Sequence, residues 1–403
     1  MLLVNLGKRG HTMRITVVKE TGNFLEIKEA WHTLCDDPEY SSSAFASFEW
    51  YETWWRHYSA GATLHMITMW DSDKLVAIAP LMLRRVTIHG LPLTALCFME
   101  NNQSLNNDFI VAPAARELFF HELLRHLSAQ TAHWDVIIFR NIPDTSLNCG
   151  ALVKALDGNG QKWLKSPTWF DSPYLVPAGS WADFLASRTT RTRKSLRNIR
   201  NGLLKSGDVS VANIRTWEEF FLVKDEVFDV ARQSWAENSG DSMASPANEA
   251  FFNDLANVFA QKGWLSLWTL RLNGKLVAIE FHLKAYAKEH AMRSHYLPEF
   301  ASLSPGTYLE MQIIKNAFEE TEKVRVYDFC GSFENYKKKW TDTFVAHDDI
   351  LIFNDRLYSR LVRFHEAVAV PLLRQLFPKN FWNSRLFRIC GINTDRMKGC
   401  SNE

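Results

Sequence analysis

The sequence has few cysteines and no long apolar run. Its six cysteines are scattered over 403 residues, with no C-x-x-C pair and no histidine partner at zinc-finger spacing. We therefore expect reduced thiols and no metal centre. No stretch approaches 18 apolar residues without a charge, and the first apolar run is too short for a signal peptide. These absences predict a soluble, cytoplasmic protein.

The sequence also lacks an excess of charge of either sign. Its 46 Lys and Arg residues nearly balance 45 Asp and Glu residues, so the formal net charge is +1. A nucleic-acid coat protein is basic over its whole domain, and we expect no DNA partner here. Apolar residues, by contrast, are plentiful at 46% of the chain. At about 150 residues per domain, the length and composition predict two globular units.

Two segments half a chain apart share the word KLVAI. LHMITMWDSDKLVAIAPLML begins at Leu64, and LSLWTLRLNGKLVAIEFHLK begins at Leu265. Each is typical of a β-hairpin, because Asp-Ser-Asp and Asn-Gly favour tight turns. Each is followed by a predicted strand, amphipathic helix and strand, at 107–113, 115–130 and 134–143 in the first copy and at 290–297, 306–320 and 324–331 in the second. This matched order predicts a duplicated α/β unit with a mixed sheet.

The duplication defines the predicted domains. Residues 1–165 form the first unit, and residues 166–353 form the second, with a mostly helical insertion at 217–262. Residues 354–403 are a tail that mixes arginines with Leu, Phe and Trp. Two interpretations of the tail stay open: a helix packed on the body of the protein, or a peripheral contact with an anionic membrane.

Seven basic residues and no acid lie between Ser187 and Gly207. Read as a helix, this segment places Arg193, Arg197 and Arg200 on one face and a leucine-rich stripe on another. The basic face is either simply solvated or binds a phosphate-rich ligand, since Arg offers planar paired donors to phosphate. Duplex DNA is the weaker interpretation, because nothing nearby resembles a helix-turn-helix.

The second hairpin carries two polar residues on one face of its second strand. Alternation places Glu280 and His282 on the same side, where they could take a proton from an amine. A strand with one solvated face is the alternative. The first copy has Ala79 and Pro80 at the positions of Glu280 and Phe281. We therefore expect the active centre in the second copy.

Two further features of the second copy suggest a binding site. Ser304, Pro305, Gly306 and Thr307 are typical of a helix N-terminus, where free N–H groups can bind an anion; a plain helix cap is the alternative. Asp328 ends a predicted strand, the position where α/β sheets usually contact ligands, although it could merely cap the turn. Tyr336, Lys337 and Trp340 follow it.

Several segments, in this order, resemble the CelD/BcsL-type acetyltransferases of the GNAT superfamily, relatives of the FemABX peptidoglycan aminoacyltransferases. They are FASFEWYETWWRHY, KLVAIAPLMLRR, RKSLRNIRNGLLKSG, NGKLVAIEFHL, SPGTYLE and YDFCGSFENYKKKW. The resemblance covers Phe45 to Phe353. It implies two tandem GNAT-like units and transfer of an acyl group, in the first place acetyl, from an acyl-CoA to a small-molecule or glycan-linked amine. Exopolysaccharide, cellulose or envelope biosynthesis is the setting that it suggests.

The resemblance also implies roles for the candidate residues. The cofactor pyrophosphate would lie at Ser304–Thr307, with Arg193 and Arg197 on the anionic part of the cofactor. The glycine-rich signature of the family is absent there, however, because Leu303 or Ala301 stands where Gln or Arg is usual. Another acyl donor therefore stays open.

The catalytic roles that follow are a base, an acid and contacts to the substrate. Glu280 with His282 would be the base, and backbone N–H groups of the strand His290–Leu297 would hold the oxyanion. Tyr336 would protonate the leaving thiolate, with Asp328, Lys337 and Trp340 at the substrate. Two alternatives remain: aminoacyl transfer from a charged tRNA, and a non-catalytic scaffold subunit.

Overall fold

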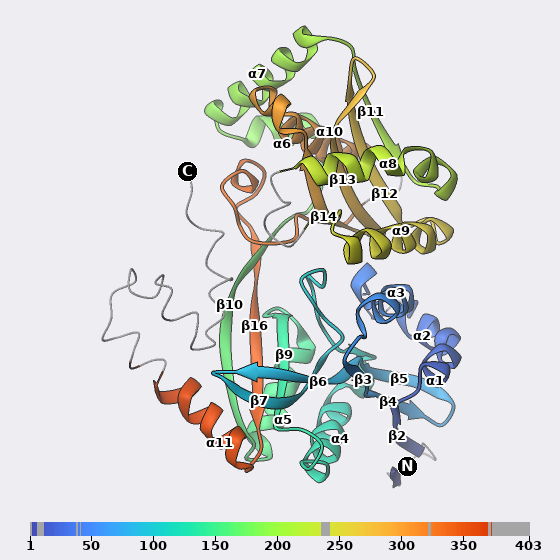
Figure 1. Ribbon diagram of the computed structural model, residues 1–403, viewed down its shortest axis with the longest axis vertical. Helices are drawn as coiled ribbons and strands as arrows, with labels where there is room; N and C mark the ends of the chain where they lie inside the picture. The colour runs from blue at the N-terminus through green and yellow to red at the C-terminus, as the bar shows by residue number, and fades with distance from the viewer. Residues whose placement is uncertain are drawn as a thin grey trace.

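The computed structural model describes residues 2–5, 12–37, 39–40, 42–234, 242–320, 324–369 and 372. It has a mixed α/β fold with a five-stranded and an eleven-stranded sheet (Figure 1). This confirms the predicted fold class. None of the helices in the described ranges combines the length and the apolar character that a membrane crossing needs.

The first unit divides its strands between the two sheets. The first predicted hairpin is confirmed as β4 and β5, and Pro80 separates β5 from β6, so that the chain passes into the larger sheet. The strands are β1 (Leu2–Asn5), β2 (Thr12–Val18), β3 (Ala62–Leu64), β4 (Met66–Asp71), β5 (Lys74–Ala79), β6 (Leu81–Ile88), β7 (Leu91–Phe98), β8 (Ile110–Val111) and β9 (Val136–Pro143). The helices are α1 (Thr21–Glu26), α2 (Lys28–Cys35), α3 (Phe48–Tyr58), α4 (Arg116–Ala129) and α5 (Leu147–Gly158).

The second unit repeats the hairpin, the crossover helix and the parallel strand. The predicted second hairpin and the helical insertion are both confirmed. The strands are β11 (Val209–Ile214), β12 (Leu265–Leu272), β13 (Lys275–Ala285), β14 (Lys288–Tyr296) and β15 (Val326–Asp328). The helices are α6 (Trp181–Ser187), α7 (Thr190–Ser206), α8 (Trp217–Gln233), α9 (Pro246–Gln261) and α10 (Pro305–Glu319). Short 3-10 turns lie at Ala44–Ala46, Pro113–Ala115, Pro298–Leu303 and Lys337–Lys339.

Strand pairing corrects the predicted alignment of the two copies. In the second unit β14 pairs in parallel with β15, and in the first unit β7 pairs in parallel with β9. The counterpart of β14 is therefore β7, and the predicted strand at 107–113 has no such role. Only Ile110 and Val111 of that segment form a strand, which pairs with β5. The prediction was wrong because the sequence match between the copies stops before β7.

Two long strands join the units. β10 (Lys162–Leu175) pairs with both β15 and β16 (Phe344–Phe353), and β16 pairs in turn with β9 of the first unit. The eleven-stranded sheet therefore runs through both units, as Figure 1 shows. The predicted boundary between residues 165 and 166 falls inside β10, so a division there would cut a strand.

The basic segment forms the predicted amphipathic helix, α7. Thr189 caps it by accepting a hydrogen bond from the N–H of Thr192 at 3.1 Å. Leu196 and Leu203 are buried in the core shared with α10, while the arginines face outward. Of the predicted tail, α11 (Leu357–Phe364) and a π-helix (His365–Ala369) lie within the described residues; the part after Leu372 lies outside them.

Candidate active site

The strands β14 and β15 run in parallel for three residue pairs and then part. The pairs are Lys288–Val326, Glu289–Tyr327 and His290–Asp328. After Asp328 the chain turns through Cys330 and Gly331, which have φ angles of 49° and 64°. β14 continues to Tyr296, paired with β13 on its other side. The strand predicted to be splayed, His290–Leu297, is therefore splayed from β15 beyond His290.

The N-terminus of α10 offers two free amides. Pro305 has no N–H, and the N–H of Tyr308 donates to the carbonyl of Ser304 at 3.2 Å. The N–H groups of Gly306 and Thr307 have no partner among the described residues. An added Cβ at Gly306 would make only an ordinary 3.6 Å contact with the Tyr296 ring. Nothing in the described chain thus demands glycine at position 306, which leaves close approach of a ligand as a reason for it.

His290 and Asp328 face each other where the strands part. The Nδ1 atom of His290 lies 3.4 Å from Oδ2 of Asp328. The carboxylate also accepts hydrogen bonds from the hydroxyl of Ser172 at 2.7 Å, the N–H of Cys330 at 2.8 Å and the side-chain amide of Asn106 at 3.1 Å. Burial opposes ionisation, but these donors and His290 hold the pKa of Asp328 well below its usual range.

This pair combines a predicted and an overlooked residue. Asp328 was predicted from its place at a strand end, whereas His290 was named only for its backbone. His290 is itself buried, at 3% exposed, and neither of its ring nitrogens has a hydrogen-bond partner among the described residues, although Nδ1 faces Asp328. Since Asp328 faces Nδ1, Nε2 is the nitrogen left to accept a proton from a group that enters the gap between the strands. The two residues meet because of the register between β14 and β15, and no local sequence pattern predicts that register.

Glu280 and His282 share a face as predicted, but that face is not open. They are 3% and 0% exposed, beneath α10. Nε2 of His282 lies 3.1 Å from Glu280, and Nδ1 lies 3.0 Å from Glu289. Burial alone would lower the pKa of His282, but the two carboxylates raise it to about 9. The raised pKa favours the imidazolium form of His282, which cannot act as a base, and burial raises the pKa of Glu280 as well.

Two residues predicted to touch substrate lie in the interior instead. Trp340 is 0% exposed, and its Nε1 donates to Glu310 at 2.6 Å. Lys337 is also buried, and its Nζ donates to the carbonyls of Cys330 and Ser332 at 2.5 and 3.0 Å. These contacts fix the turn after β15. Tyr336 is 41% exposed, and its role as a proton donor stays a prediction.

The cations of α7 face solvent beside α10. Six of them are exposed, and none pairs with a carboxylate of the described chain; they are Arg191, Arg193, Lys194, Arg197, Arg200 and Lys205. Arg188 differs, since it donates to the carbonyl of Trp340 at 3.1 Å. Because α7 packs against both α10 and the 3-10 turn before it, its cations can meet an anion bound near this end of the sheet. Contact of Arg193 and Arg197 with a cofactor stays a prediction.

A surface hollow lies on the other side of the sheet. It has a volume of about 810 Å³ between α8 and α9 and is lined by residues such as Lys224, Arg232 and Asp254. None of the predicted site residues contributes to it. The predicted residues Ser304–Thr307 and Asp328 lie instead beside the gap between β14 and β15. This gap is therefore the candidate active site.

The region that contains the candidate site is similar to a known protein family. Residues 190–338 match the acetyltransferase (GNAT) domain family. The matched stretch begins with α7 and includes β14, the N-terminus of α10 and Asp328, so the free amides and the His290–Asp328 pair all lie within it. No curated protein matches the sequence.

Solved structures extend the likeness beyond the stretch that matches this family. The crystal structure of FemX has a TM-score of 0.58 at 12% identity, covering 87% of this chain and 100% of that one. The C-terminal domain of an Agrobacterium fabrum protein described as a lysylphosphatidylglycerol synthetase has a TM-score of 0.51 at 11% identity, covering 87% and 97%. At these identities the likeness shows the fold, which spans both units.

Proposed function

We propose that this protein is an N-acyltransferase that moves an acyl group from a thioester donor, acetyl-CoA in the first instance, to an amine. The observation that carries the proposal is the gap between β14 and β15, which opens next to the start of α10 within the stretch that matches the GNAT domain family. The free amides of Gly306 and Thr307, with the positive end of the helix dipole, suit a donor phosphate. The thioester then lies in the gap beside His290.

In this arrangement His290 is the base and Asp328 orients it. Nε2 of His290 takes a proton from the amine as its nitrogen attacks the thioester carbonyl. Backbone N–H groups on the open edge of β14 stabilise the oxyanion. Collapse forms the C–N bond and breaks the C–S bond, and the thiolate leaves with a proton from His290 or from Tyr336. Glu280 lies one strand further from the gap and positions the buried network around His282.

Binding of the donor can be measured by thermal shift with acetyl-CoA. A ligand at 100 times its Kd stabilises a protein by about 2.7 kcal/mol. We expect Gly306→Val to lose the shift, because the added side chain stands beside the two free amides. Gly150→Ala in α5, where an added Cβ meets nothing within 4 Å, is the control. If no acyl-CoA shifts the wild type, the donor assignment is wrong, and a scaffold role gains support.

Turnover can be followed as thiol release from acetyl-CoA with a panel of amines that includes glucosamine and lysine. Loss of a general base typically lowers the rate by about 10²–10⁴-fold. We expect this loss for His290→Gln and a much smaller one for Glu280→Gln. The reverse order would restore Glu280 as the base and remove His290 from the mechanism.

Aminoacyl transfer from a charged tRNA is the second candidate, and α7 is the observation that favours it. Its six exposed cations form a basic strip without carboxylate partners in the described chain. Phosphate contacts make nucleic-acid binding fall steeply with salt. If tRNA is the donor, the double variant Arg193→Ala/Arg197→Ala should bind tRNA with a weaker dependence on salt. The slope of log K against log salt concentration should fall by the equivalent of about two phosphate contacts, while acetyl-CoA should give no thermal shift.

The acceptor that we propose is a small-molecule or glycan-linked amine of exopolysaccharide, cellulose or envelope biosynthesis, which the family resemblance supports. A peripheral membrane location also fits α11. Leu357, Leu361 and Phe364 are exposed on it beside Arg360 and Arg363, a combination typical of interfacial helices.

A further inference from the structure

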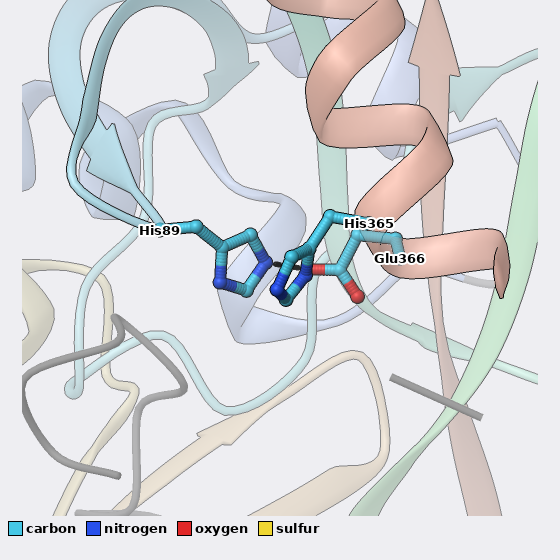
Figure 2. Close-up of side chains that lie close together, drawn as sticks. All are labelled: His89, His365 and Glu366. Atoms are coloured by element: carbon cyan, nitrogen blue, oxygen red, sulfur yellow. Dashed lines mark hydrogen bonds and ion pairs between the residues drawn. The ribbon is translucent and has the colours of Figure 1, made fainter. Parts of the chain in front are cut away.

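Three side chains with metal-ligating atoms meet where the segment after α11 contacts the first unit. They are His89, His365 and Glu366 (Figure 2), and one ligand atom from each lies within 4.8 Å of the other two. Nε2 of His89 is 2.7 Å from Oε1 of Glu366, and the two imidazole rings are 3.6 Å apart between centroids. His89 and Glu366 are 277 positions apart in the sequence, so no spacing motif indicates the cluster.

The backbone holds His89 in an unusual position. His89 and Gly90 form the two-residue turn between β6 and β7, with φ angles of 51° and 77°. Two positive φ angles define a type I′ turn, for which Asn-Gly is the usual choice. A histidine at the first turn position accepts a conformation that L-residues seldom adopt. Its side chain is thereby directed from the hairpin tip toward Glu366 (Figure 2).

The other two residues begin a π-helix, His365–Ala369. Successive side chains on an α-helix are 100° apart, whereas the wider π-turn, with about 4.4 residues, reduces this to about 80°. Neighbouring residues such as His365 and Glu366 can therefore face the same side. Single π-turns are rare and are frequently found at functional sites.

The chemistry of the cluster suits a divalent cation. Nδ1 of His365 is buried and has no hydrogen-bond partner among the described residues. Two imidazole nitrogens and one carboxylate oxygen are a ligand set that zinc favours, with water at the fourth position.

We propose that His89, His365 and Glu366 bind a zinc-like divalent transition metal ion that fastens the π-helix to the β6–β7 turn. Binding replaces the hydrogen bond between His89 and Glu366: the nitrogen of His89 that binds the ion loses its hydrogen, and the other ring nitrogen takes one up from solvent. The site is separate from the gap between β14 and β15. It also departs from the expectation, drawn from cysteine and histidine spacing, of a protein without metal.

The test uses the full chain without a polyhistidine tag, stripped of metal with a chelator. Zinc binding is measured by calorimetry, and Co²⁺ is added for its visible d–d absorption. We expect one ion per chain. His89→Asn is the main variant, because asparagine suits the turn while one ligand is lost. Since even outer-shell changes weaken metal sites by about 10–100-fold, we expect at least a tenfold loss of affinity.

Two controls keep the result interpretable. His121→Ala removes an exposed histidine of α4 and should bind zinc like the wild type, whereas Glu366→Gln should weaken binding. Equal affinity of wild type and His89→Asn, or absence of binding in the wild type, would overturn the proposal. A second cluster, His290, Asp328 and Cys330, also has ligand atoms close together. Cobalt–thiolate absorption that disappears in Cys330→Ser would place the ion there and refute the site at His89.

Discussion

Glu310 gives a prediction about how stability depends on pH. Its carboxyl is buried on α10 and accepts the Nε1 hydrogen of Trp340 at 2.6 Å. Burial, and then the charge of Glu280, raise the pKa of Glu310 from 4.5 to about 8. Between these values the folded protein holds a proton that the unfolded chain releases. The free energy of unfolding should therefore fall as pH rises from about 4.5 to about 8.

The magnitude follows from the proton difference. One proton corresponds to about 1.4 kcal/mol per pH unit, so at most about 2 kcal/mol is lost between pH 5.0 and 6.5. Because Glu280 lies in the same buried site and its charge affects Glu310, we expect a loss of about half of this free energy. The pH range of this measurement, 5.0 to 6.5, lies below the range in which His282 affects stability. Because the pKa of His282 is raised from 6.5 to about 9, its contribution to stability is lost only as pH rises between these two values.

The assay is urea denaturation of wild type and Glu310→Gln at pH 5.0, 5.75 and 6.5. Glutamine keeps an acceptor for Trp340 but has no titrating proton, so the stability of Glu310→Gln should fall by about 1 kcal/mol less than that of the wild type. Glu319→Gln, at the exposed end of the same helix, should follow the wild type. Parallel profiles for wild type and Glu310→Gln would show that Glu310 ionises normally and would refute the buried network.

Three further predictions concern α7 and α11. Leu203→Ala removes a fully buried side chain and should cost about 2–5 kcal/mol in urea denaturation, whereas Leu204→Ala next to it, on the exposed side, should cost far less; similar losses would contradict the orientation of α7. Gly202→Ala, where an added Cβ meets nothing within 4 Å, should stabilise the helix by about 1 kcal/mol in the same assay, and destabilisation would mean that the position is not helical. Leu361→Asp with Phe364→Asp should reduce flotation with anionic liposomes, and unchanged flotation would remove α11 from membrane binding.

The hairpins and α7 could be predicted because their signals are local. Asn273 and Gly274 specify a tight turn, and the spacing of Leu196 and Leu203 specifies one apolar face of a helix. In each case the residues that decide the structure lie within one turn or one helix. The structure confirms both elements with nearly the expected limits.

The site could be predicted only in part because its contacts are long-range. Alternation along β13 shows that Glu280 and His282 share a face, but not that α10 covers it. The pairing of His290 with Asp328 depends on the register of two strands separated by α10. The interior position of Trp340 depends likewise on a partner, Glu310, 30 residues away. Local pattern identified the residue types near the site, and tertiary packing decided which of them meet.

The place of β16 in the large sheet has a consequence for biosynthesis. Asn141, on β9, and Asp349, on β16, are joined by a hydrogen bond although they lie 208 positions apart. At about 5–20 residues per second, β9 leaves the ribosome some 10–40 s before its neighbour exists. During that interval one edge of a buried strand is unpaired, a state prone to aggregation. Early termination before residue 344 should therefore yield insoluble nascent chains, because the sheet of the first unit is completed only after β16 has been translated.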